Sequence, residues 1–177
     1  MNRSVSLLLS ALIIGIISFG ACKPLEDPCE ETQWKDIEDP VINIRLTSEA
    51  STINHNLTTY QISQASEVSF TGTITKYYCS GKESGSFDFS ATFLPVNGTI
   101  ALNNIKIGGP YQFNFQNDKD YVSVSVRMRV AFPDGTVFRP RETDYRNFYF
   151  KNIQLNANNL EYYVLFTIYS STIFVPV

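Results

Sequence analysis

The chain has 177 residues, a length that corresponds to one domain. Its 14 basic and 17 acidic residues give a formal net charge of −3, which is not basic enough to indicate a nucleic-acid-binding protein. No internal repeat and no low-complexity stretch stands out in the sequence, so a solenoid or a repetitive fibrous protein is not indicated.

The first 21 residues have the features of a secretory signal. Residues 5–19 are almost wholly apolar, Arg3 precedes them, and small residues follow. A charged start, an apolar stretch of this length and a small-residue exit are typical of a cleaved signal peptide. A transmembrane anchor is the alternative, but it needs about 20 apolar residues, and this stretch is shorter and interrupted by serine and glycine. We therefore predict that residues 1–21 are a signal peptide.

The end of this segment, Phe19-Gly20-Ala21-Cys22, resembles the lipobox of bacterial lipoproteins. The resemblance is confined to residues 1–22, and Phe19 stands where leucine is usual. It implies removal of the signal, attachment of a diacylglycerol to the Cys22 thiol, and usually a third acyl chain on the new amino group. Two or three acyl chains anchor a protein stably, whereas one holds it only marginally. The alternative is an ordinary secreted protein that is cut near Ala21.

An acidic segment follows the lipobox-like stretch. Residues 22–40 contain two basic and seven acidic residues, a net charge of −5, whereas the chain from Val41 onward carries +1. Such a segment repels anionic headgroups and stays extended, and it looks like the tether of surface-displayed lipoproteins. Lys23 follows Cys22, and in Gram-negative lipoproteins a residue other than aspartate at that place permits transfer to the outer membrane. We predict a tether at 22–40, a folded domain at 41–177, and anchoring in the outer membrane through the N-terminal lipid.

The remaining two cysteines are predicted to pair. Cys29 and Cys79 are left once Cys22 is assigned to the lipid, and the periplasm is oxidising. A disulfide that closes a loop of this length stabilises a fold by about 4 kcal/mol in the chain-entropy treatment. Two unpaired thiols are the alternative. The sequence has no CxxC motif and no Cys/His cluster, so we predict no metal site and no cofactor.

From Val41 onward the sequence is typical of β-strands. Threonine, valine, isoleucine, tyrosine and phenylalanine dominate, hydrophobic residues alternate with polar ones, and no stretch has a helical period. Asn97-Gly98 and Asp134-Gly135 are hairpin turn signals. The clearest strand covers 121–132, with an inward face of Val122, Val124, Val126, Met128, Val130 and Phe132. The other expected strands are 41–47, 58–63, 67–78, 86–93, 111–115, 146–155 and 161–177.

This succession of short strands and turns predicts an all-β fold. We expect a single antiparallel β-sandwich, immunoglobulin-like or jelly-roll-like. A lipocalin-like barrel is the alternative, because a barrel also buries alternate residues of each strand.

Four arginines form the first candidate site, for an anion. If Phe132 pairs with Thr136, then Arg129 lies opposite Arg139 and Arg127 lies opposite Arg141. Like charges directly opposite each other destabilise a sheet, so the four need a counter-ion. It is either internal, from Glu142, Asp144 or a neighbouring strand, or it is a ligand carboxylate, sulfate or phosphate, which guanidinium binds in a bidentate manner. The sequence favours the internal answer, because charged groups on a sheet are usually solvated or paired locally.

Paired tyrosines form the second candidate site, for stacking on sugars. Tyr77-Tyr78 and Tyr162-Tyr163 place one ring on each face of a strand, so one ring of each pair should be exposed. Exposed tyrosines offer a broad, rigid surface with a polar tip, on which a sugar can stack. Ordinary strand residues are the alternative.

No arrangement of residues in the sequence indicates catalysis. The one histidine, His55, lies among polar residues without a partner to position it, and no nucleophile, paired-carboxylate or phosphate-loop motif is present. The stretch 117–120 offers oxygens to a calcium ion, but it lacks the glycine and the distal glutamate of a known loop. We predict that the protein is not an enzyme but a lipid-anchored binding module for a glycan, a peptide or a partner protein of the envelope. The alternative is a structural or assembly subunit of a surface complex.

Overall fold

The computed structural model describes residues 29, 41–115, 119–142, 144–149, 154–156 and 161–177. By compactness the chain divides into Met1–Glu30 and Glu31–Val177, and all described strands belong to the second unit. The first strand begins at Val41. The predicted signal peptide, Cys22 and the predicted tether, apart from Cys29, lie outside the described residues.

The second unit is built from β-strands, and one short 3-10 helix, Ile62–Gln64, is the exception in the part of it that the structure describes. The first six strands are β1 (Val41–Ser48), β2 (Thr52–His55), β3 (Thr58–Gln61), β4 (Glu67–Tyr77), β5 (Glu83–Phe93) and β6 (Ile105–Gln112). The others are β7 (Tyr121–Ala131), β8 (Val137–Pro140), β9 (Asp144–Tyr149), β10 (Gln154–Asn156), β11 (Glu161–Ile168) and β12 (Phe174–Pro176).

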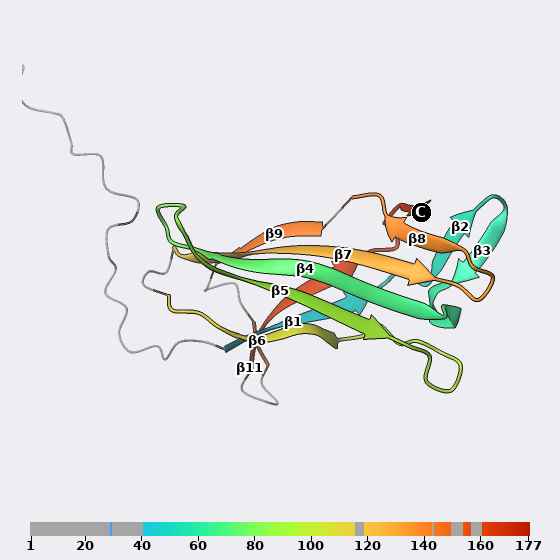
Figure 1. Ribbon diagram of the computed structural model, residues 1–177, viewed down its shortest axis with the longest axis horizontal. Helices are drawn as coiled ribbons and strands as arrows, with labels where there is room; N and C mark the ends of the chain where they lie inside the picture. Colours follow the sequence, from blue (N-terminus) through green and yellow to red (C-terminus); the bar gives the residue numbers. More distant parts are fainter. Residues whose placement is uncertain (1–28, 30–40, 116–118, 143, 150–153, 157–160) are drawn as a thin grey trace, which may run out of the picture. The chain divides into compact units, whose positions relative to one another are not determined.

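These strands form an antiparallel β-sandwich that is not closed into a barrel (Figure 1). One sheet has the order β10-β11-β1-β6, and the other has the order β12-β8-β7-β4-β5 with β9 also on β7. The β2-β3 hairpin forms a small third sheet. All pairs are antiparallel except β1 and β11, which run parallel. The predicted all-β sandwich is confirmed, and the barrel alternative is wrong.

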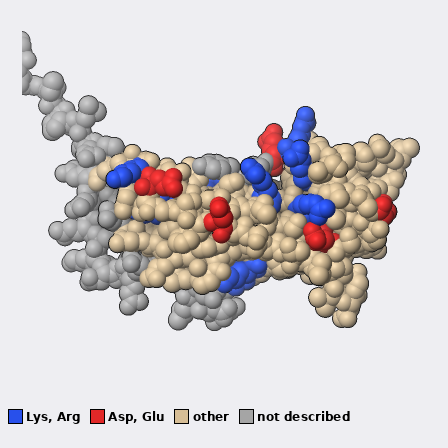
Figure 2. Space-filling model, viewed as in Figure 1, with Lys and Arg blue, Asp and Glu red and all other residues tan. Residues whose placement is uncertain are grey.

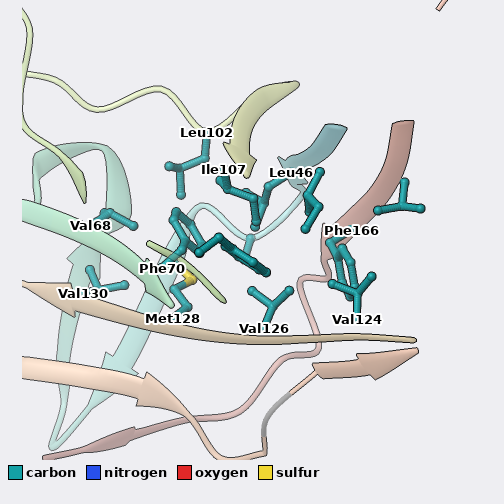
Figure 3. Close-up of a cluster of buried hydrophobic side chains, with 14 of the residues drawn as sticks. Leu46, Val68, Phe70, Leu102, Ile107, Val124, Val126, Met128, Val130 and Phe166 are labelled. Carbon is teal, nitrogen blue, oxygen red and sulfur yellow. The ribbon is translucent and has the colours of Figure 1, made fainter. Parts of the chain in front are cut away.

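The core lies between the two large sheets and follows the alternation of the sequence. The six predicted inward residues of the strand at 121–132 are all buried. Figure 3 shows side chains of β4 and β7, among them Phe70 and Met128, facing Leu46 of β1 and Phe166 of β11. The burial of these apolar faces is the main stabilising contribution to the sandwich.

The predicted turns are confirmed by their hydrogen bonds. Val96 N–H donates to Thr99 O at 2.8 Å around Asn97-Gly98, and Phe132 N–H donates to Thr136 O at 2.8 Å around Asp134-Gly135. In the second turn, Thr136 N–H also donates to Asp134 Oδ1 at 2.9 Å. This backbone hydrogen bond lowers the pKa of the Asp134 carboxyl, because it stabilises the charged form.

Three predicted strands differ from those in the structure. The strand expected at 146–155 is divided between β9 on the six-stranded sheet and β10 on the four-stranded sheet. The strand expected at 111–115 is instead β6, Ile105–Gln112, which begins earlier and contains Gly109-Pro110. The start of this strand was not predicted because glycine and proline usually interrupt strand pairing. Here the register of β6 against β1 shifts between Ile42 and Ile44, which accommodates the irregular stretch. The expected C-terminal strand is divided, with β11 between β10 and β1 as a central strand and β12 on the other sheet.

Candidate functional site

A polar groove lies on the outer face of the six-stranded sheet, across β7, β4 and β5. Because side chains alternate along a strand, the residues between the buried ones point away from the core here. The groove has a volume of about 440 Å³. Its lining consists of Thr71, Gly72, Thr73, Asp88, Phe89, Ser90, Ser125 and Arg127, and we call this surface the polar groove.

Gly72 forms the middle of the floor of the polar groove. It lies opposite Phe89 of β5 on one side and Val126 of β7 on the other. A Cβ atom at this position would lie 2.4 Å from Phe89 Cζ and 2.1 Å from Ser125 O, so no larger residue fits without a shift of the backbone. Gly72 is an inward-facing position of β4, between the buried Phe70 and Ile74, so only its main chain faces the groove, with short hydroxyl side chains around it.

The two walls of the polar groove carry opposite charges. Arg127 lies on β7 and Asp88 lies on β5, with β4 between them, and they are offset by two residues because Arg127 pairs with Thr71 and Asp88 with Thr73. Two strand spacings and this offset place their backbones about 12 Å apart. Thr73 Oγ1 donates to Asp88 Oδ1 at 2.7 Å and orients that carboxylate. Arg127 is exposed, and within the described residues its guanidinium has no ion pair or hydrogen bond. The groove thus offers five N–H donors on one wall and carboxylate and hydroxyl oxygens elsewhere.

The four predicted arginines do not face one another along one ladder. Phe132 does pair with Thr136, but β8 pairs with β7 only at Val130↔Phe138 and Ala131↔Val137. Neither Arg129 with Arg139 nor Arg127 with Arg141 is among these pairs. The predicted ladder is wrong because β8 ends at Pro140 and β9 takes its place on β7 from Asp144 onward.

The arginines also differ in their partners. Arg129 Nη1 forms an ion pair with Glu67 Oε1 of β4 at 2.9 Å, so its counter-ion is internal and comes from a neighbouring strand. Both side chains are solvent-exposed, at 49% and 36%, so this ion pair stabilises the fold only slightly. Arg127, Arg139 and Arg141 are exposed and have no such acidic partner among the described residues.

The paired tyrosines are not exposed platforms. All four rings are half-buried, so the expected exposure of one ring in each pair is wrong. Tyr77 stacks on Tyr121 with ring centroids 5.2 Å apart, and the Tyr78 ring lies 3.4 Å from Lys76 Nζ. Tyr162 packs against the core, and the Tyr163 ring lies under the Arg45 guanidinium at 6.0 Å. Each ring therefore contacts another side chain of the protein, and these contacts could not be predicted from the sequence.

The predicted disulfide is confirmed, since Cys29 and Cys79 are bonded to each other. Cys79 lies in the turn between β4 and β5, where its N–H donates to Asp120 Oδ1 at 2.8 Å. Asp120 Oδ2 in turn lies 3.1 Å from Lys76 Nζ, and both side chains are almost fully buried, at 2% and 1% exposure. Asp120 is therefore a structural ion-pair partner beside the disulfide. Asn117 and Asp118, the first two residues of the stretch weighed for calcium, lie outside the described residues.

The one histidine, His55, is packed against the core. His55 is half-buried and packs edge-on against Phe138, with ring centroids 5.6 Å apart. Within the described ranges, no three side chains of His, Cys, Asp or Glu come together in a way that would hold a metal ion. The described part of the chain likewise has no helix with the length and hydrophobicity needed to cross a membrane.

Most residues of the polar groove were not singled out from the sequence. The feature of the sequence that could have indicated the groove is the series of serines and threonines on the outward faces of three strands. On one of these strands, 86–93, Asp88 and Ser90 lie on the face that does not carry the phenylalanines. Alternation shows that such residues point outward, but only the strand order β7-β4-β5 brings them together. Comparison with protein-family models, with characterised proteins and with solved structures gave no match for this chain.

Proposed function

We propose that the protein is a lipid-anchored binding module of the cell envelope that recognises a hydroxyl-rich ligand, a glycan, in the polar groove. The observation that carries this proposal is the groove itself, an open hollow with short hydroxyl side chains around a backbone floor. A carboxylate held by Thr73 on one wall and an exposed guanidinium on the other offer both acceptors and donors.

The composition of the groove favours a glycan over an apolar peptide. Four hydroxyls, from Thr71, Thr73, Ser90 and Ser125, line the groove beside the two charged groups. Sugars present closely spaced hydroxyls that both donate and accept, which matches this lining. In the view of Figure 2, acidic and basic residues are interspersed instead of forming one large patch of a single sign. A field of one sign would instead favour a highly charged polymer.

A glycan array tests this proposal. Binding of neutral and uronic-acid-containing oligosaccharides would be compared between the wild-type chain and Arg127→Ala. We expect selective binding by the wild type and a loss of about tenfold in affinity for the variant, since a hydrogen bond to a charged group contributes about 1.5–3 kcal/mol. Arg139→Ala is the matched control, because Arg139 is exposed on the neighbouring β8 and lies outside the groove. Absence of binding to all oligosaccharides would argue against this function.

The membrane attachment is proposed from the sequence. The apolar segment before Phe19-Gly20-Ala21-Cys22 supports cleavage before Cys22 and acylation of its thiol, and Lys23 supports delivery to the outer membrane. Metabolic labelling with palmitate should mark the wild-type protein and leave Cys22→Ser unmarked. A Cys22→Ser protein that matures and fractionates with membranes like the wild type would contradict the anchor.

A second candidate function, as a structural subunit of a surface complex, is favoured by exposed apolar loop tips. Leu57, at the β2-β3 turn, is fully exposed and has a φ of 64°, an unusual conformation for leucine. Leu94 and Val96, in the loop after β5, are 63% and 73% exposed. Figure 1 shows both loops at the same end of the sandwich.

Copurification distinguishes the two functions. If the loop tips contact a partner, Leu57→Asn combined with Val96→Ser should release the protein from an outer-membrane complex that retains the wild type and Arg127→Ala. Glycan binding through the polar groove would be unaffected by the loop substitutions. An isolated monomer in wild-type membranes would contradict the structural role.

A further inference from the structure

On the side away from β4, strand β7 pairs with two short strands, β9 and β8, which do not meet. β9 pairs with residues 121–126 of β7, and β8 pairs with Val130 and Ala131, so among the described residues no strand pairs with 127–129 on that side. β8 ends at Pro140 and β9 begins at Asp144. At this break a crevice leads from the surface into the space between the two sheets.

The crevice has an apolar interior. Five side chains from four strands form its inner part: Leu46 of β1, Phe70 of β4, Val126 and Met128 of β7, and Phe166 of β11. All five are buried and meet between the sheets, as Figure 3 shows. The volume of the crevice is about 250 Å³, which exceeds the roughly 150 Å³ of an apolar protein cavity that admits benzene. A single ring or a short acyl chain fits such a space.

The mouth of the crevice is polar and carries charges of both signs, from Arg146 and Glu142. Arg146 lines it, with the guanidinium carbon 5.4 Å from the centre of the Phe166 ring. A second depression, of about 310 Å³, shares Pro140, Glu142 and Thr172 with the crevice and adds Arg141. Arg141 N–H donates to Ile173 O at 2.8 Å, which holds the backbone in place. The exposed guanidinium of Arg141 has no ion pair or hydrogen bond with any residue described.

We propose that this crevice binds a small amphipathic carboxylate, with the apolar chain among Phe70, Met128 and Phe166 and the carboxylate on Arg141. The apolar interior has no partner for a polar group, so only the apolar end of a ligand is stable there. A planar guanidinium binds a carboxylate in a bidentate manner. Glu142 at the mouth repels anions, and it repels a doubly charged phosphate more strongly than a monocarboxylate, which favours the monocarboxylate of the two. The crevice shares no residue with the polar groove, so this proposal is independent of the glycan.

The methyl group of Met128 is a specific reporter of the crevice. The chain has two methionines, Met1 and Met128, so ¹³C-methyl labelling of the full chain gives a spectrum that Met128→Leu assigns. Titration with octanoate should shift the Met128 signal in a saturable way. Octan-1-ol, which has the same chain without the charge, should bind about tenfold more weakly, because it lacks the charge-assisted hydrogen bonds.

Variants at the mouth distinguish the contribution of the charge to binding from the contribution of the apolar contacts. Arg141→Ala should weaken octanoate binding about tenfold and leave the binding of octan-1-ol unchanged, whereas Arg139→Ala should change neither. Arg139 is likewise exposed, but it lies outside both depressions. No shift of the Met128 methyl with octanoate would overturn the site. Equal weakening of both ligands by Arg141→Ala, or equal affinity of the wild type for both, would overturn the role of Arg141.

Discussion

The two faces of strands β4 and β7 have opposite properties. The inner face of β4 carries Val68, Phe70 and Ile74, which are fully buried, while the outer face carries Thr71 and Thr73 in the polar groove. β7 repeats this arrangement, with buried valines inside and Ser125 and Arg127 outside. The inner face holds the sandwich together, and the outer face is free to bind. Substitutions on the two faces should therefore affect different measurements.

Lys76 is the exception on the inner face, and we expect the largest effect there. Lys76→Met leaves the buried Asp120 carboxylate without its cation, which costs about 3–5 kcal/mol of unfolding free energy. Urea unfolding measures this loss of stability. At urea concentrations below the unfolding transition, the variant should bind the glycan with the same affinity as the wild type. The double variant Lys76→Met with Asp120→Asn should recover much of the stability, because it removes the unpaired charge and keeps an acceptor for Cys79 N–H. Equal destabilisation by the single and double variants would contradict this account of the pair.

Gly72 belongs to both faces, so its replacement should alter both measurements. Gly72→Ala places a Cβ atom against Phe89 and Ser125 O. Overpacking of this kind costs about 1–3 kcal/mol, and the backbone shift that relieves it displaces the floor of the polar groove. We expect a lower midpoint of urea unfolding together with weaker glycan binding. Unchanged stability would show that the close approach of Phe89 to Gly72 is not maintained in solution.

The outer-face arginines should contribute little to stability. Arg129→Ala removes an exposed ion pair with Glu67 and should lower the unfolding free energy by no more than about 1 kcal/mol. Arg127→Ala removes no pair among the described residues and should leave stability within about 0.5 kcal/mol of the wild type. Thermal and urea unfolding of both variants check this. A large loss in Arg127→Ala would mean that the outer face also holds the fold together.

The smallest effect is expected at the Asp134 turn. The hydrogen bond from Thr136 N–H lowers the pKa of Asp134 in the folded state, so the charged carboxylate is favoured there. The stabilisation is complete above the pKa of the unfolded state and is lost as the pH falls through the lower pKa of the folded state. Unfolding midpoints measured from about pH 5 to about pH 2 should therefore fall more for the wild type than for Asp134→Asn. Parallel curves for the two proteins would contradict the expected linkage.

The sequence was sufficient to predict the elements that depend on local pattern. The alternation from Val122 to Phe132 predicted one buried face, and every residue of it is buried, because a strand has a strict period of two. The two turns were predictable from Asn97-Gly98 and Asp134-Gly135 for a similarly local reason. The pairing of Cys29 with Cys79 followed from their number and the expected compartment.

Features that depend on contacts between distant strands were not predictable. Glu67 lies 62 residues before its partner Arg129, and only the pairing of β4 with β7 brings them together. The polar groove needs the strand order β7-β4-β5, and the crevice needs the break between β8 and β9. Nothing in the sequence around Tyr78 indicates that its ring lies over the buried Lys76.

We propose that a glycan occupies the outer face of β7, β4 and β5. Amide chemical shifts of the ¹⁵N-labelled chain, recorded with and without the oligosaccharide selected on the array, locate the bound glycan residue by residue. We expect the changes to concentrate at residues 71–73, 88–90 and 125–127, on three strands at once. Changes confined to the β2-β3 hairpin, the loop after β5 or the crevice would contradict it.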